Sequence, residues 1–335
     1  MTDSIIRAPK FEFGAAITQI FNLPGGKGYL FRVVGFATLL LTVAFVLFGI
    51  PIVKSYVAMF QSIATMEETT GMSEAEELAA VMATMQPMFA SMGWFSLLYI
   101  AQIGLYISVE TGLYRNIIRG EDKGFFPLRF GGDEFRVLVT RIVVAFILYA
   151  AFFVLYIGLI ILGAMVFGLG SAAESTAVYG VVALFAFLSF VAFIGGMVYV
   201  AIRLAPSAAF AVRDEDFTPV GSWGTMKTYF WPTFGAVLVV GLIGYIGLVV
   251  LSLLAFGLLF VSSGIFPLLM ELDVDETPDF TPLLDLLSSA GFIIPAILIT
   301  LVFTFLGLLY YGAIWSIWGY VAKLTDRQKT LNEYG

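Results

Sequence analysis

Two residue types that carry much of protein chemistry are missing: the 335 residues include no cysteine and no histidine. Without cysteine there are no disulfides and no thiolate nucleophiles, and without histidine there is no imidazole acid-base catalysis. Together the two absences also remove the usual ligand sets of zinc, haem and iron-sulfur sites. We therefore expect no enzyme activity, no cofactor and no bound metal.

Charged residues are scarce as well, at 12% of the chain, where an average soluble domain has about a quarter. The sequence is instead apolar, with 60% hydrophobic residues and a mean hydropathy of +0.97. A water-soluble protein of this composition could not cover its own core. The composition therefore indicates a surface that faces lipid.

Six apolar stretches are long enough to cross a bilayer, because about 20 helical residues span its hydrocarbon core. The sequence therefore predicts an all-α polytopic membrane helical bundle, with a single integral membrane domain over residues 1–335. We expect the first stretch to be retained and not cleaved as a signal peptide, because Lys10, Glu12 and Lys27 interrupt the region before it. The predicted transmembrane helices cover residues 29–53, 93–114, 137–167, 177–204, 232–262 and 289–321.

Basic residues are unequally divided between the two sides of these spans. Lys54 is the only one on one side. The other sixteen are Arg7, Lys10, Lys27, Arg32, Arg115, Arg119, Lys123, Arg129, Arg136, Arg141, Arg203, Arg213, Lys227, Lys323, Arg327 and Lys329. Since Lys and Arg are retained on the cytoplasmic side, we expect both termini in the cytoplasm.

The opposite side is predicted to be acidic. Its loops carry Glu67, Glu68, Glu74, Glu76, Glu77, Glu174, Glu271, Asp273, Asp275, Glu276, Asp279 and Asp285. The net charge of −7 is thus polarised across the membrane and gives no indication of nucleic-acid binding.

Similar segments precede the first, third and fifth spans and suggest three repeats of one helical hairpin. Each mixes Phe or Trp with glycine, a proline and at least one basic residue, as expected of amphipathic segments in the membrane interface. Repeated hairpins would be parallel and related by an axis along the membrane normal. Convergent interfacial composition explains the similarity about as well. The segments cover residues 10–32, 123–141 and 216–232.

The second span carries two faces with a four-residue period. Gly104, Ser108 and Gly112 form a small-residue ridge that lets another backbone approach closely. We favour helix packing within one chain as its role over an oligomer contact, although the sequence indicates no particular oligomeric state. On another side of the helix lies a polar stripe of Gln102, Tyr106, Glu110 and Tyr114.

Glu110 is the one acidic residue inside a predicted span, which makes it a functional candidate. It lies about one turn from the cytoplasmic end of its span, at a similar depth to arginines in neighbouring spans. Opposite charges in one layer pair, so we favour a structural ion-pair layer over a substrate or proton site. The candidate intramembrane polar site comprises Gln102, Tyr106, Glu110, Arg141 and Arg203.

Two outer-side features raise the question of metal binding. Thioethers are soft ligands that suit Cu(I), but the methionine cluster is better interpreted as the flexible face of an amphipathic helix. The acidic stretch ELDVDETPDF lacks the spacing of an EF-hand, so we expect a solvated loop. The methionines are Met59, Met66, Met72, Met82, Met85, Met88 and Met92.

Helix-breaking residues lie at Pro206, Pro295 and the pair Gly195 and Gly196. Broken helices mark binding sites in many transporters, yet proline and glycine are also common in ordinary membrane helices. We interpret these positions as ordinary kinks.

The segment RLAPSAAFAVRDEDFTPVGSWGTMKTYFWPTFGAVLVV joins the fourth and fifth spans, from Arg203 to Val240. Its order of residues resembles the six-helix bacterial membrane proteins related to the membrane domain of glycerophosphoryl diester phosphodiesterases and to the YciC-like inner-membrane family. The matching positions, Ser222, Trp223, Lys227 and Trp231, form an interfacial elbow. Because the sequence includes no phosphodiesterase domain, the resemblance implies a module of the bacterial inner membrane and no activity.

Two classes of function follow from these observations. The first is a noncatalytic scaffold, assembly or regulatory module of the cell envelope, in contact with membrane lipids and another envelope protein. The second is a transporter or lipid-handling protein for a small or anionic substrate, with the polar site as its cavity. Removal of Glu110 separates them: it abolishes an activity in the second class and lowers stability in the first.

Overall fold

In the computed structural model, which describes residues 9–66, 73–122, 128–171, 176–263, 285–286 and 289–334, the chain is almost entirely helical. No strand occurs among these residues. The elements are α1 (Phe13–Thr18), the 3₁₀ turn η1 (Gln19–Phe21), α2 (Gly26–Met66), α3 (Glu74–Arg119), α4 (Gly132–Ser171), α5 (Thr176–Leu204), α6 (Ser207–Asp214), α7 (Ser222–Ser263) and α10 (Ala290–Tyr334).

Six of these helices, α2, α3, α4, α5, α7 and α10, are long and apolar enough to cross a membrane. This confirms the predicted all-α, multi-pass membrane protein. The helices extend beyond most of the predicted spans: α3 alone has 46 residues and reaches about 69 Å, more than twice the hydrocarbon thickness. Helices of this length tilt or project beyond the bilayer.

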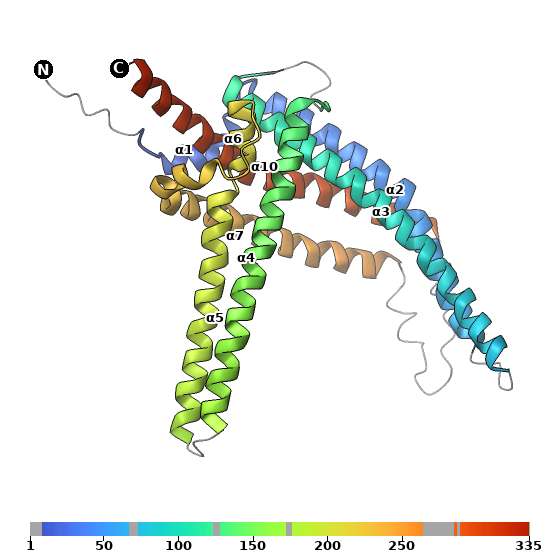
Figure 1. Ribbon diagram of the computed structural model, residues 1–335. Coiled ribbons are helices and arrows are strands. Elements are labelled where there is room, and N and C mark those ends of the chain that lie inside the picture. The colour runs from blue at the N-terminus through green and yellow to red at the C-terminus, as the bar shows by residue number, and fades with distance from the viewer. Residues whose placement is uncertain are drawn as a thin grey trace, which may run out of the picture.

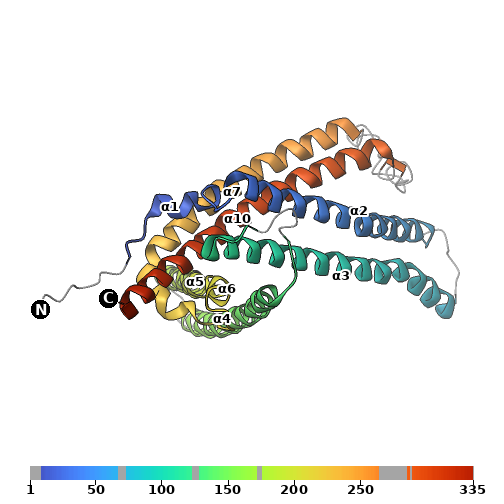
Figure 2. The ribbon, with the colours of Figure 1, turned by 90° about the horizontal axis from the view of Figure 1, so that it is seen from above.

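The long helices form three hairpins, α2 with α3, α4 with α5 and α7 with α10. Figure 1 shows the α4–α5 hairpin running away from the α2–α3 hairpin, and Figure 2 shows it nearly end-on while the other two extend to one side. The hairpins meet at one end, where α1, α6 and the end of α10 also lie (Figure 1). The molecule therefore has a shared base and three diverging arms.

The base comprises residues 9–41, 107–122, 128–144, 199–237 and 305–326. The arms comprise residues 42–66 with 73–106, residues 145–171 with 176–198, and residues 238–263 with 289–304.

Among the residues that the structure describes, most buried side chains lie in the base. At its centre is α6, with residues 207–212 all buried against α3, α4, α7 and α10. Phe210 is 1% exposed and packs in one cluster with Tyr114, Met226 and Ile317. A second cluster joins α2 to α3 and α10. In the arms, by contrast, the buried hydrophobic residues that the structure describes are few, such as Ala44, Ile52 and Leu98.

The segments that precede α2, α4 and α7 differ from one another despite their similar composition. Before α2 the chain forms α1 and η1, before α4 it is non-helical over residues 128–131, and before α7 it forms α6 and a turn. The three-hairpin arrangement is present, but these segments do not repeat one structure. In the third, α7 already begins at Ser222, so the predicted elbow residues lie in the first turns of a continuous helix.

The predicted helix interruptions have different outcomes. Pro206 separates α5 from α6, because its missing N–H and its ring prevent α5 from continuing. Pro295 lies inside α10. Gly195 and Gly196 lie inside α5, where Gly196 faces Leu155 of α4 and a β-carbon there would be 3.5 Å from the leucine.

Several predicted features lie outside the described residues. These are Arg7, Lys123, Met72, Glu67, Glu68, Glu174, Glu271, Asp273, Asp275, Glu276 and Asp279. Of the methionine cluster, Met82, Met85, Met88 and Met92 are exposed on α3, which continues as one helix from Glu74 into the membrane-spanning segment.

Candidate functional site

The structure brings Glu110 of α3 and Arg141 of α4 together in a buried ion pair. Glu110 is 3% exposed, and the Nε of Arg141 donates to its two carboxylate oxygens at 3.0 and 3.3 Å. A second guanidinium nitrogen of Arg141 also bonds Glu110 Oε1. The hydroxyl of Tyr114, one turn along α3, donates to the same oxygen at 2.7 Å. The carboxylate is thus fully engaged by the protein's own donors.

The arginine of this pair also closes the end of α5. The last carbonyls of a helix have no partner within the helix, and Pro206 ends α5 abruptly. Nη1 of Arg141 donates to the carbonyl oxygen of Ala205 at 3.2 Å. A positive group near the C-terminal end of a helix is also favourable to the helix dipole. Arg141 therefore ties α3, α4 and the end of α5 together.

Arg203 belongs to a different contact, 7% exposed at the end of α5. Its Nε donates to the carbonyl oxygen of Trp223 at 3.0 Å, and its guanidinium lies 4.1 Å from the centre of the Trp223 ring. Nη1 donates to the Tyr199 hydroxyl at 2.6 Å. The buried Ser222 hydroxyl donates to the Arg203 carbonyl at 2.6 Å. Arg203 and the elbow together attach α5 to α7.

The other two elbow residues face outward. Lys227 is exposed, and Trp231 is 74% exposed beside the rings of Phe230 and Phe234. A tryptophan and a lysine on the outside of a membrane helix near its end are typical of interfacial anchors. The elbow thus has an inner half, Ser222 and Trp223, that joins helices and an outer half suited to the lipid headgroup layer.

The polar stripe of α3 does not line one cavity. Tyr106 packs against Tyr311 and Trp315 of α10, with ring centres at 5.7 and 6.1 Å. Glu110 instead faces Arg141 of α4, and Gln102 is half-buried further along the arm. The cavities between α2 and α10, between α3 and α4, and between α4 and α5 are lined by other residues.

The small-residue ridge of α3 packs within the chain, though against a non-helical segment. The Ser108 hydroxyl donates to the carbonyl oxygen of Arg129 at 3.1 Å, and a β-carbon on Gly104 would lie 3.7 Å from the Phe130 ring. The carbonyl oxygen of the buried Gly112 accepts a hydrogen bond from the Tyr29 hydroxyl at 2.9 Å. Gly104 and Ser108 thus pack against the segment before α4, and Gly112 packs against α2.

A charged network at the end of α3 was not predicted from the sequence. Arg115 bonds Glu134, and Arg119 and Arg136 bond Asp133 at 2.9 and 2.8 Å. Arg119 also donates to the backbone carbonyl of Val212, which attaches α6. The acids open α4, where a negative charge favours the helix dipole. The sequence does carry a signal for this network. Asp133 and Glu134 are adjacent at the start of α4, and the preceding helix α3 ends with Arg115 and Arg119.

Comparison with protein-family models, with curated proteins and with solved structures gives no match to this chain. The resemblance of residues 203–240 to the phosphodiesterase membrane domain and the YciC-like family therefore stays a prediction.

Proposed function

We propose that this chain is a noncatalytic scaffold or assembly module of the bacterial inner membrane, with both termini in the cytoplasm. In this proposal the base holds the three arms in place, and a transmembrane helix of another envelope protein packs on the α4–α5 arm. The excess of basic residues on one side of the spans supports the orientation.

The observation that carries the proposal is an exposed seam along α4. Phe146 and Phe153 are 74% and 57% exposed and lie seven residues apart. Tyr149, Tyr156 and Ile160 are also exposed and continue the spacing of three and four residues, so the seam follows the 3.5-residue period of helix-packing interfaces. The partner helix α5 packs on another side of α4, where Phe152 meets Phe193 and Leu155 faces Gly196.

The state of the polar residues supports a noncatalytic role. General acid-base catalysis needs a side chain that can give or take a proton and that lies within hydrogen-bond reach of the substrate. Glu110 is occupied by Arg141 and Tyr114, and the chain has neither histidine nor cysteine. A substrate at the buried Glu110 would have to displace the guanidinium of Arg141, so the ion pair is better suited to holding helices together than to transport.

In-cell photo-crosslinking along α4 tests the scaffold proposal. Benzoylphenylalanine is placed at Phe146 and Phe153 on the seam and, as a matched control, at Val154 and Ile161, which are exposed on another face of the same helix. We expect one protein to be crosslinked from both seam positions and from neither control position. After identification by mass spectrometry, the same probe placed in a span of that protein must crosslink back to α4.

Crosslinks to lipid alone from all four positions would overturn the proposal, as would protein adducts of equal yield on both faces. The first result would leave the seam as an ordinary lipid-facing surface, and the second would show that protein contacts on α4 do not select the seam.

A further inference from the structure

The helices α2 and α10 separate on leaving the base. Within the base they pack closely: the rings of Phe31 and Phe305 stack with centres 6.3 Å apart, and Leu41 and Leu308 belong to one buried cluster. Beyond Leu41 the two helices diverge and enclose a cavity of about 370 Å³. The result is a wedge that is closed at the base and open toward the end of the arm.

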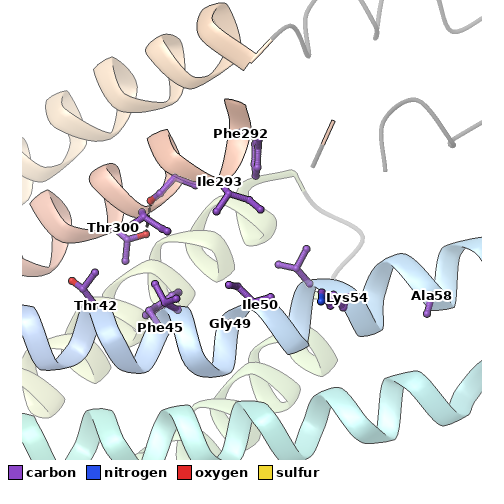
Figure 3. A pocket seen from close by; sticks show the side chains of 13 residues that line it. Thr42, Phe45, Gly49, Ile50, Lys54, Ala58, Phe292, Ile293 and Thr300 are labelled. Carbon is purple, nitrogen blue, oxygen red and sulfur yellow. Dashed lines mark hydrogen bonds between the residues drawn. The ribbon is translucent and has the colours of Figure 1, made fainter. Parts of the chain in front are cut away.

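The wedge is apolar along its length and carries one charge at its open end. Figure 3 shows Phe45 and Ile50 of α2 and Phe292 and Ile293 of α10 around the space between the two helices. The hydroxyl of Thr300 donates to the carbonyl oxygen of Ala296 within α10 at 2.8 Å, so it is already satisfied. The cationic group of the lining is Lys54.

Lys54 is the only basic residue that the sequence places on the acidic side of the membrane. It is exposed, and within the described part of the chain no carboxylate pairs with it. A lysine at this depth extends its ammonium toward the headgroup layer while its methylene chain stays against apolar surface. Lys54 is thus the position in this arm where an anion meets an opposite charge.

The dimensions select a thin, flexible occupant. From Thr42 to Lys54 the wedge extends about 18 Å along α2, close to the roughly 15 Å of one leaflet's hydrocarbon. A helix is about 10–12 Å across, whereas the wedge narrows toward the base until α2 and α10 touch at Phe31 and Phe305. A lipid acyl chain can therefore follow the wedge along its length, where a transmembrane helix does not fit.

We propose that the wedge between α2 and α10 binds one lipid with an anionic headgroup, its acyl chain along Phe45, Gly49 and Ile297 and its headgroup at Lys54. This site lies between the other two arms, away from the α4 seam, and is independent of the scaffold proposal.

Photo-labelling of the full-length protein in nanodiscs tests the site. The probes are phosphatidylglycerol and phosphatidylcholine, each with a diazirine on one acyl chain, and the adducts are mapped by mass spectrometry. We expect the anionic probe to label residues 45–58 and 292–300 in preference to the zwitterionic one. Lys54→Gln is expected to lower this preference about fivefold, as for one lysine at an anionic surface, and Lys54→Arg to retain it.

A second variant tests the cavity itself. Gly49→Leu fills the wedge and is expected to lower labelling there about tenfold. Gly257→Leu is the matched control, because a side chain at that glycine of α7 would meet open space. Equal labelling of every arm, an unchanged lipid preference in Lys54→Gln, or equal effects of the two leucine variants would each overturn the site. Size-exclusion elution in detergent checks that every variant is folded.

Discussion

In the base, the short helix α6 and several charged side chains, such as Glu110, Arg115 and Glu134, are buried, whereas the arms expose large apolar residues around most of their circumference. Val137 and Val154 belong to the same helix, α4, yet the first is 0% exposed in the base and the second is 70% exposed in the arm. The difference between base and arms shows where this membrane protein needs tertiary contacts.

The difference follows from what each region must satisfy. Within the hydrocarbon a helix pairs all of its backbone groups internally, and lipid is as apolar as the side chains it contacts. The arms therefore need little mutual packing. At the base the helices end, and their last carbonyls and first N–H groups need partners. Arg141 supplies such a partner to the carbonyl of Ala205 at the end of α5, and Arg203 joins the end of α5 to the first turn of α7.

The largest effect is expected from Glu110→Ala. The substitution leaves Arg141 without its carboxylate in the base, which costs several kcal/mol for a buried pair. Because the Arg141 side chain is 26% exposed and can extend toward water, we expect a loss of about 3 kcal/mol. The measurement is the free energy of unfolding of the purified protein in mixed detergent micelles.

The double variant Glu110→Leu with Arg141→Met is its control. Replacing both partners by apolar residues removes the unpaired charge, so most of the lost stability should return. A single variant as stable as the parent protein would show that the base does not depend on this pair.

A smaller effect is expected where α7 meets α10. A β-carbon on Gly244 would overlap the Tyr310 ring, so Gly244→Ala requires the ring or a helix to move and should cost about 1–3 kcal/mol. Gly247→Ala, in the same helix with nothing near its added carbon, should instead stabilise by about 0.5–1 kcal/mol through helix propensity. The measurement is the free energy of unfolding of both variants, and the prediction is wrong if both changes have the same sign.

The helices and their number could be predicted from hydropathy because an apolar run of about 20 residues has few alternatives in a membrane. The divergence of the arms could not. Hydropathy assigns the same value to Val137 and to Val154, and the burial of one and exposure of the other depends on where α4 ends and on what packs there. The burial of α6 at the centre of the base could not be predicted for the same reason, because the residues SAAFAV give no indication of which helices pack around them.

The candidate site was partly predictable. Depth along the helix was enough to expect Glu110 opposite an arginine, and the structure selects Arg141. Depth alone also placed Arg203 in that layer, whereas its partners are the Trp223 carbonyl and the Tyr199 hydroxyl. Counting charges cannot reveal a backbone carbonyl as the partner. That choice depends on how close Pro206 and the following turn bring α5 to α7.

The smallest effect is expected at Val154 of α4, which is compared with the same substitution at Val137 of that helix. Val137→Ala removes two methyl groups from a fully buried site and should cost about 2 kcal/mol, from lost burial plus the cavity that remains. Val154→Ala removes the same groups from a side chain that is 70% exposed and should change stability by less than about 0.5 kcal/mol. Both values are measured in the purified protein by unfolding in mixed micelles. Equal losses at the two positions would mean that the α4–α5 arm packs against other helices in solution, and the contrast between base and arms would then have to be abandoned.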